Sequence, residues 1–287
     1  MLYDDFITDM AIESAENLNM ADSSKSEDVG FDIVKRFLNI KTKDMANRIG
    51  KPVGIYITFD CPHTIYSSSH GAKAIEDNLS STIKNLVGIV KKSSPILVAC
   101  LGNGQISADS LGQKVFDKLE ITRKKDVQQA HKQSVCALST SVLGKTGIES
   151  AEIISAVVKE IKPSFVLLVD SLATSVPKRV GLSFQLSTAG ITPGSGVGGD
   201  KERIDKTVLG VPVLSIGVPT LLALNTLVYG LFKDYAEQFG RGLDEYAFRT
   251  LLAEKKMSNM VVAPKDVDAL AEKASVIISD AINLALN

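Results

Sequence analysis

Residues 96–112, ILVACLGNGQISADSLG, and residues 165–174, FVLLVDSLAT, decide the fold of this chain. Each segment begins with a short apolar run that is typical of a strand buried on both faces of a sheet. An aspartate follows each run, Asp109 after a glycine-rich turn and Asp170 directly after the strand. Because ligands bind at the carboxyl ends of strands in an open α/β sheet, we expect both carboxylates to lie near one crevice.

Two carboxylates in such a crevice can activate water for hydrolysis, one acting as the base and the other as the acid or as an orienting group. Both residues have simpler explanations as well. Asp109 would also serve as the N-cap of the helix that follows it, and Asp170 as the polar end of a strand. We therefore treat Asp109 and Asp170 as candidate catalytic residues.

The rest of the chain alternates between strand-like and helical patterns. Strands are expected at 52–59, 96–100, 165–169, 181–186 and 211–216. Helices are expected at 31–40, 72–90, 147–159, 220–233, 243–255 and 266–286, and after Asp109 as far as residue 119. Residues 1 to about 30 are polar and are expected to be irregular. No linker or internal repeat divides the chain, so we predict a single α/β domain with a mostly parallel sheet flanked by helices.

Composition narrows the classes of function. The formal net charge of -1 argues against a non-specific nucleic-acid binder and against a binder of anionic membranes. The N-terminus lacks the features of a secretion signal, and no apolar stretch approaches the roughly 18 residues of a membrane span. The 3 cysteines are widely spaced and fit a reducing compartment. We expect a cytoplasmic protein.

Other reactive side chains do not form a known catalytic motif. His63, His70 and His131 share no zinc-binding spacing, so neither a metal nor another cofactor is expected. Cys61 and His63 flank a proline, and packing explains them better than a nucleophile pair does. No serine lies in a GxSxG elbow, which leaves a serine hydrolase weakly supported.

A loop at residues 190–199 is rich in glycine but fails the test for a phosphate-binding loop, because no lysine follows it and Asp200 would repel a phosphate. Its glycines would allow close backbone approach to a substrate, or offer amides to an oxyanion. A purely structural cluster of turns is an equally good explanation. The candidate substrate-contacting residues are Gly190, Gly194, Gly196 and Gly198.

Five blocks in the middle of the chain carry a resemblance to a known family. They are LGNGQISADSLGQKVFDKLEITR (101–123), CALSTSVLGKTGIESAEII (136–154), KPSFVLLVDSLAT (162–174), QLSTAGITPGSGVGG (185–199) and LGVPVLSIGVPT (209–220). Together they resemble the germination proteases of spore-forming bacteria, endopeptidases that degrade small acid-soluble spore proteins in the spore core. The resemblance implies an unusual aspartic peptidase, unrelated in fold to pepsin, with Asp109 and Asp170 as its catalytic pair.

The same resemblance implies a homotetrameric zymogen that removes its own N-terminal prosegment. In that family the cut lies in a sequence that imitates the acidic-apolar-Ala-x-Glu site of the substrates. Residues 8–13, TDMAIE, have that form, so we expect the cut between Asp9 and Met10. Residues 1–9 would then be the prosegment, and residues 10–287 the peptidase domain. The family usually has Arg where this chain has Ile7.

Two other interpretations stay open at this point. The segment LGNGQISADSLG also resembles the glycine-asparagine turn of hydrogenase-maturation peptidases, whose fold we expect to be similar. In that family a histidine helps to recognise nickel, and this chain has no histidine after His131. The third interpretation is a catalytically silent binding protein of the same fold. The presence of both Asp109 and Asp170 within intact motifs favours the enzyme.

Overall fold

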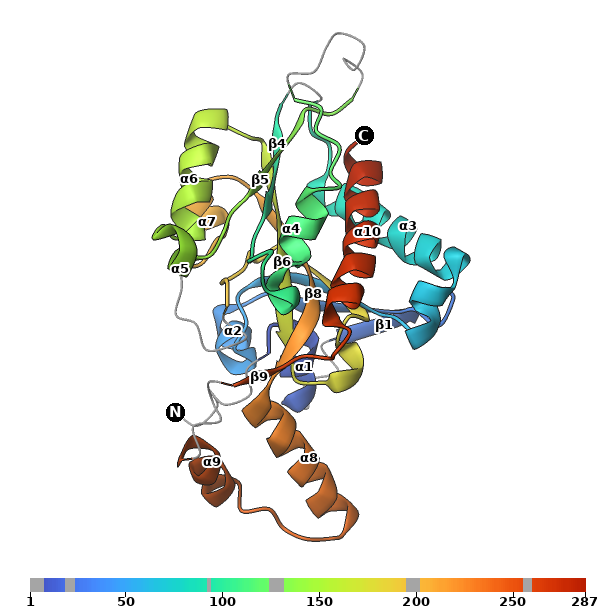
Figure 1. The fold of residues 1–287 in the computed structure, drawn as a ribbon, viewed down its shortest axis with the longest axis vertical. Helices are drawn as coiled ribbons and strands as arrows, with labels where there is room; N and C mark the ends of the chain where they lie inside the picture. The colour runs from blue at the N-terminus through green and yellow to red at the C-terminus, as the bar shows by residue number, and fades with distance from the viewer. Residues whose placement is uncertain (1–7, 19–23, 92–93, 124–131, 195–201, 255–259) are drawn as a thin grey trace.

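The computed structural model describes residues 8–18, 24–91, 94–123, 132–194, 202–254 and 260–287. Every strand in these ranges belongs to one sheet (Figure 1). The strand order is β1-β2-β3-β7-β8-β6-β4-β5, and β9 pairs with β8. The strands are β1 (Ser24–Asp28), β2 (Val34–Ile40), β3 (Gly54–Asp60), β4 (Ile96–Cys100), β5 (Val135–Ser139), β6 (Phe165–Thr174), β7 (Ser183–Ser187), β8 (Val213–Ala223) and β9 (Val261–Val262).

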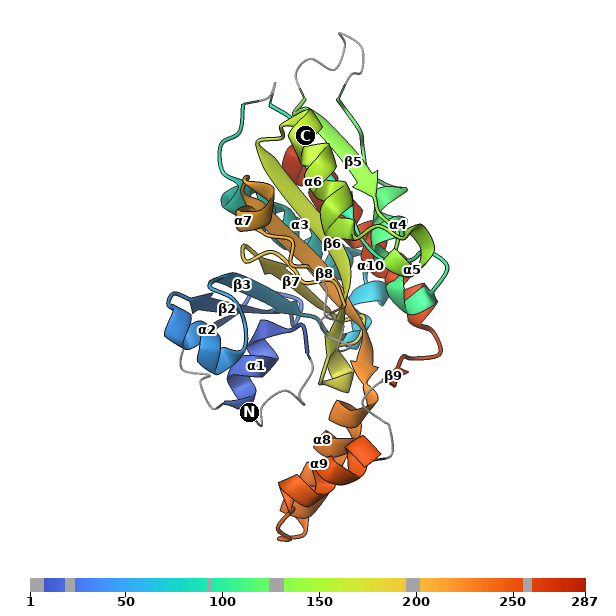
Figure 2. The same cartoon turned by 90° about the vertical axis from the view of Figure 1, so that its left-hand side faces the viewer.

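Helices flank this sheet, as expected. They are α1 (Ala11–Asn17), α2 (Lys43–Ile49), α3 (Ser69–Val87), α4 (Leu111–Phe116), α5 (Leu143–Thr146), α6 (Ser150–Ile161), α7 (Lys206–Leu209), α8 (Leu224–Gln238), α9 (Glu245–Glu254) and α10 (Val267–Leu286). Short 3-10 helices include η2 (His63–Ser67), η3 (Ser107–Asp109) and η5 (Pro177–Arg179). In Figure 2, α6 and α7 cover one face of the sheet while α3 and α10 lie behind it, and α8 and α9 extend beyond the sheet as an arm.

The prediction of an α/β fold is confirmed, but the sheet is mixed. Strands β5, β4, β6 and β8 pair in parallel, whereas the remaining pairs are antiparallel. The connections explain the difference. The links from β4 to β5 and from β5 to β6 carry helices and can cross over, whereas only residues 29–33 join β1 to β2, which is enough for a hairpin. The parallel half is the part that carries both candidate aspartates.

Two expectations near the N-terminus are wrong. Residues 34–40 form β2 rather than a helix. The backbone pairs with β1 and β3, and Leu38 and Ile40, two positions apart, both face α1. Residues expected to be irregular form α1 and β1. Ala11 and Ala15 of α1 pack in the same cluster as β2, and β1 is polar because it is an edge strand held by main-chain pairing.

Residues 220–223, expected to begin a helix, continue strand β8, and α8 starts at Leu224. The strand is longer than its apolar run because β6 runs beside it as far as Thr174. Both strands therefore extend beyond the apolar segments from which they were predicted. This extension carries residues 170–174 of β6 to the edge of the sheet where the candidate site lies.

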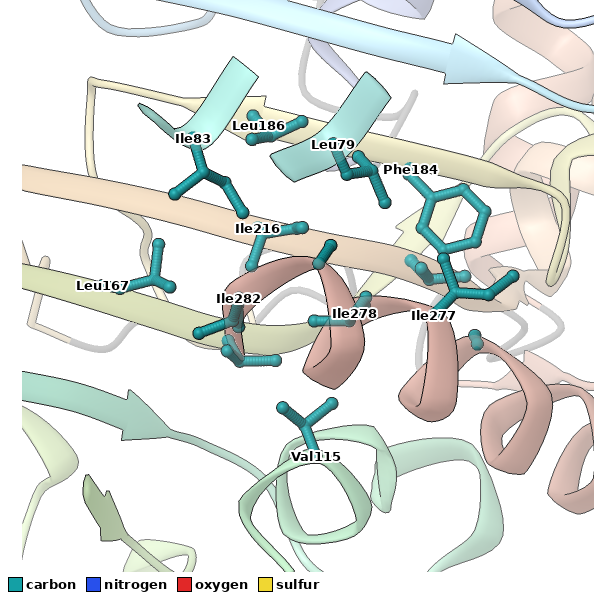
Figure 3. Close-up of a cluster of buried hydrophobic side chains, with 14 of the residues drawn as sticks. Leu79, Ile83, Val115, Leu167, Phe184, Leu186, Ile216, Ile277, Ile278 and Ile282 are labelled. Carbon is teal, nitrogen blue, oxygen red and sulfur yellow. The ribbon is translucent and has the colours of Figure 1, made fainter. Parts of the chain in front are cut away.

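Strict alternation along β6 divides the core into two layers. Leu167 and Val169 face α3, α4 and α10, in the cluster shown in Figure 3, where Ile278 and Ile282 of α10 pack against the sheet. Val166 and Leu168 face α6 on the other side. Asp170 continues this second series, so its side chain points to the α6 face.

The packing of α10 can be tested with two variants of one helix. Ile278 is fully buried, and replacing it with alanine is expected to lower the free energy of unfolding by about 2–5 kcal/mol, because a cavity forms between α10 and the sheet. Val276 is 41% exposed, and Val276→Ala is expected to stay within about 0.5 kcal/mol of the parent. Urea unfolding followed by circular dichroism measures both. Equal losses would contradict this packing.

Candidate active site

Asp109 is positioned by a tight turn after β4. The backbone N–H of Asn103 donates to both the carbonyl oxygen (2.9 Å) and the Oδ2 (2.8 Å) of Asp109. Gly102 has a φ of +105°, and a Cβ there would lie 2.3 Å from the Asp109 carbonyl oxygen. Only glycine tolerates both conditions, since other residues rarely adopt this backbone conformation. The glycine-rich turn therefore serves to bring the Asp109 carboxylate back to the end of β4.

Asp170 lies inside β6 rather than beyond its end, and it is 7% exposed. The backbone N–H of Ser171 donates to its Oδ1 at 2.9 Å. In the sheet, Asp170 pairs with Gly217 of β8, and Gly217 pairs with Gln185 of β7. A Cβ at Gly217 would lie 2.6 Å from the Asp170 carbonyl oxygen, so a larger residue would displace β6.

The structure brings both aspartates to one cavity of about 170 Å³. Its walls come from the turn after β4, from the end of β6, from the start of α6 and from the loop after β7. The lining residues are Asp9, Leu101, Gly102, Ala108, Asp109, Ser141, Val142, Ser150, Asp170, Ser171, Leu172, Ala173, Pro193, Gly194 and Leu221. Two carboxylates on one cavity can supply a general base and a general acid, the two roles that acid–base hydrolysis uses.

Asp9, the residue before the expected cut, lines this same cavity. Its backbone N–H donates to the Ala173 carbonyl oxygen at 2.9 Å, and the Ala173 N–H donates to its Oδ2 at 2.8 Å. The carbonyl oxygen of Asp9 accepts a hydrogen bond from Gln185 Nε2 at 3.0 Å. Met10 and Ala11 follow and are fully buried. The N-terminal segment is thus docked across β6 and β7.

A buried ion cluster holds the segment from its other end. Glu13 is 1% exposed, and its carboxylate lies 3.2 Å from Arg179 Nη1 of η5. It also accepts hydrogen bonds from the Ser175 N–H (2.7 Å), the Thr8 hydroxyl (2.6 Å) and the Thr174 hydroxyl. Arg179 in turn contacts Asp60 of β3 at 3.1 Å. The cluster ties α1 to β3, β6 and η5.

Burial and charge around this cluster together shift three pKa values. Burial alone would raise the pKa of Asp60, but the charge of Arg179 and hydrogen bonds from Ser183 and Arg36 hold it below its ordinary value. For the cationic Arg179, burial alone would lower the pKa, but the negative charges of Asp60 and Glu13 raise it above its ordinary value. Burial lowers the pKa of Lys51, against the opposing charges of Asp9 and Glu13, and its Nζ donates to the Thr8 carbonyl oxygen at 2.5 Å.

The glycines of the loop after β7 divide into three groups. Gly194 lines the cavity. Gly190 packs against the backbone of residues 204 and 205, where a Cβ would lie 2.2 Å from the Ile204 carbonyl oxygen, so its role here is close packing. Gly196 and Gly198 lie outside the described residues.

The other reactive side chains lie away from the cavity. Burial, with a contribution from the Asp60 charge, raises the pKa of the Cys61 thiol to about 12, which keeps it a neutral thiol near neutral pH. His63 and His70 are exposed, and His131 lies outside the described residues. Within the described ranges, no group of three or more His, Cys, Asp or Glu side chains could hold a metal ion. The same ranges contain no helix that could span a membrane.

Comparison with known proteins identifies similar sequences over most of the chain. A family profile described as germination protease matches residues 9–258. The germination protease of Clostridium acetobutylicum is 34% identical over 310 residues, covering 97% of this chain and 94% of that protein. That of Caldanaerobacter subterraneus subsp. tengcongensis is 36% identical over 260 residues, covering 83% and 80%.

The chain belongs to the germination protease family. It is therefore a peptidase, and the expected resemblance is confirmed. The germination protease of Bacillus licheniformis is 28% identical and covers 98% of this chain and 93% of that protein. Among solved structures, the NiFe hydrogenase maturation protease HycI from Thermococcus kodakarensis KOD1 aligns with a TM-score of 0.39 and 16% identity, covering 70% of this chain and 98% of that chain.

Sequence reasoning missed Gln185 and the partners of Glu13 in this germination protease. The signal for Gln185 was the block QLSTAG, in which a glutamine stands among apolar strand residues. A polar side chain that is 6% exposed within a strand needs hydrogen-bond partners. Its partners are 174 and 176 positions away in the chain, which no local pattern indicates.

The ion cluster predicts how stability depends on acid. Because the pKa of Asp60 is lowered in the folded protein, its stabilising contribution is present above its unfolded pKa of about 3.9 and is lost as pH falls through the folded value. Asp60→Asn is expected to cost on the order of 3 kcal/mol at pH 7. Below about pH 4, the difference between the variant and the parent should shrink.

Thermal unfolding at pH 7, 5 and 3.5 measures this effect. The matched control is Asp77→Asn, which removes a carboxylate that is 55% exposed and pairs with Lys73 on the surface of α3. That change should cost well under about 1 kcal/mol at every pH. An Asp60→Asn deficit that stayed constant down to pH 3.5 would show that the charge of Asp60 does not stabilise the fold.

Proposed function

We propose that this peptidase uses Asp109 and Asp170 to activate water and that it starts the degradation of small acid-soluble spore proteins during germination. One observation carries the proposal: Asp9, which precedes the expected cut, lines the same cavity as the two aspartates. A segment with the sequence form of a cleavage site is thus docked where the two carboxylates meet a cavity.

In the proposed reaction, one aspartate takes a proton from a water molecule in the cavity while the water oxygen attacks the peptide carbonyl. The other aspartate, in its protonated form, donates a proton to the departing amine. The fixed positions of both side chains support these roles. Asp109 is held by the Asn103 N–H and Asp170 by the Ser171 N–H, so neither carboxylate has to reorganise before it reacts.

The uncut chain is an inactive zymogen in this proposal, and residues 1–9 are its prosegment. Asp9 occupies one wall of the cavity, and Met10 and Ala11 are buried beside it, so a substrate peptide meets an occupied site. Cutting between Asp9 and Met10 separates the two halves of the docked segment. The site of action is the cytoplasm of the spore core, where the substrates lie.

The active form is proposed to be a homotetramer, and the arm formed by α8 and α9 supports association. Phe232 of α8 packs on Phe248 of α9, with ring centroids 4.9 Å apart. Around this contact, large apolar side chains remain exposed on the arm, which extends beyond the sheet (Figure 2). They are Leu231, Phe232, Tyr235, Phe239, Tyr246 and Leu251. An apolar patch of this kind marks an interaction surface.

The catalytic pair is tested with Asp109→Asn and Asp170→Asn. Each is expected to slow both self-cleavage and cleavage of a purified small acid-soluble spore protein by at least about 10²–10⁴-fold, because proton transfer at that position is lost. Mass spectrometry of the product ends measures the rate and identifies the cut. The expected new ends are Asp9 and Met10.

The matched control is Asp117→Asn, an exposed aspartate at the end of α4 that contacts Gln113 and does not line the cavity. It should cleave at the parent rate. Cleavage that persists in either cavity variant would move the chemistry to other residues. If the parent shows no cleavage, even after residues 1–9 are removed, the chain would be a silent member of the fold.

A further inference from the structure

We propose that Gln185 of β7 takes part in the reaction, by holding both sides of the Asp9–Met10 peptide bond and polarising its carbonyl group. Gln185 Nε2 donates to the carbonyl oxygen of Asp9 at 3.0 Å, and the N–H of Ala11 donates to Gln185 Oε1 at 2.8 Å. One side-chain amide thus makes hydrogen bonds to the backbone on both sides of the Asp9–Met10 bond. The inference rests on the proposed function, because it takes Asp9–Met10 as the bond that is cut.

The chemistry of the partners determines the orientation of this amide. A carbonyl oxygen can only accept a hydrogen bond, and a backbone N–H can only donate one. The amide nitrogen must therefore face Asp9 and the amide oxygen must face Ala11, so the alternative flip of the side chain would lose both hydrogen bonds. The donor is aimed at the oxygen on which negative charge develops when water attacks.

Register in the sheet places Gln185 on the same face as Asp170. Asp170, Gly217 and Gln185 are directly paired across β6, β8 and β7, and side chains in one such row emerge on one face. The Cα atoms of Asp170 and Gln185 therefore lie two strand spacings apart, roughly 10 Å. A Cβ at Gly217, between them, would lie 2.7 Å from Leu172 Cγ, so the Leu172 side chain covers the middle of the row. Asp9 is hydrogen-bonded to Ala173 of β6 and to Gln185 of β7, the two strands on either side of β8.

Burial makes this donor effective. Gln185 is 6% exposed, and Met10 and Ala11 are fully buried, so little water competes for the Asp9 carbonyl oxygen. A fixed donor in such a site stabilises the developing oxyanion, and removing one typically costs about 10²–10³ in rate. The same burial means that the amide nitrogen needs a new acceptor when Asp9 leaves with the proposed prosegment. The carbonyl oxygen of an incoming substrate backbone supplies it.

A purely structural role must be separated from this one, because the Gln185 oxygen also binds the first N–H of α1. Gln185→Glu makes the separation: it keeps an oxygen for the Ala11 N–H and removes the donor to the Asp9 carbonyl. Gln185→Leu has a similar volume and removes both. The control is Gln133→Glu, since Gln133 Nε2 also donates to backbone carbonyl oxygens, those of Lys91 and Ser94. Gln133 precedes β5, whereas the cavity-lining Ser141 follows the other end of that strand.

The experiment follows self-cleavage of the full-length chain by mass spectrometry and records the thermal midpoint of each uncut variant. Gln185→Glu and Gln185→Leu are both expected to cut about 10²–10³-fold more slowly than the parent. Gln185→Glu is expected to lower the thermal midpoint, because a buried carboxylate then faces the Asp9 carbonyl oxygen, so its rate is compared with that of the parent at an equal distance below each midpoint. Gln133→Glu should cut at the parent rate. If Gln185→Glu fails to fold, the rate of Gln185→Leu decides.

Parent-like cutting by Gln185→Glu would overturn the role of this residue. So would slow cutting that returns to the parent rate when the temperature is lowered by the loss in thermal midpoint, because that pattern reports only a weakened α1. Failure of the proposed function looks different. In that case the parent does not cut between Asp9 and Met10, or the Asp109→Asn and Asp170→Asn variants still cut this bond at the parent rate.

Discussion

The buried ion pair between Glu13 and Arg179 is the interaction on which the position of the N-terminal segment depends. A carboxylate that is 1% exposed is costly unless charge and hydrogen bonds compensate it. Here Arg179, Ser175 and two threonine hydroxyls do so, and they belong to η5, to the end of β6 and to the segment itself. Because Glu13 cannot shift without losing these partners, Asp9 is held a fixed four residues away, at the cavity.

The sheet supplies the second constraint, through alternation and register rather than through any special motif. Because side chains alternate along β6, Leu167 and Val169 face α10 and Asp170 faces the opposite layer. Pairing through Gly217 then aligns Asp170 with Gln185. Glycine at position 217 is required by the close approach of the β6 backbone and of the Leu172 side chain, which packs where a Cβ would lie. One packing constraint therefore joins the strands and fixes the register between Asp170 and Gln185.

The parts of this arrangement that could be predicted from the sequence are those that local patterns encode. The apolar runs before Asp109 and Asp170 marked two neighbouring parallel strands, β4 and β6. The helical pattern predicted for 31–40 failed because pairing with β1 and β3 overrides a short apolar periodicity. Gln185 and Glu13 could not be assigned, since apart from Thr8 their partners lie more than 160 positions away. A single polar residue in a sequence does not indicate where its partner lies.

The docked segment also explains how a cut could release the site. As long as the chain is continuous, Met10 carries a neutral amide and is fully buried at no electrostatic cost. Cleavage after Asp9 converts that amide into an ammonium group and creates a new carboxylate at Asp9. Burying an unpaired charge costs several kcal/mol, so the docked position would favour the uncut chain over the two charged ends that a cut creates. In the proposed cut, Glu13 would stay on the α1 side, so the proposed prosegment ending at Asp9 would lose its covalent link to this anchor and leave the cavity.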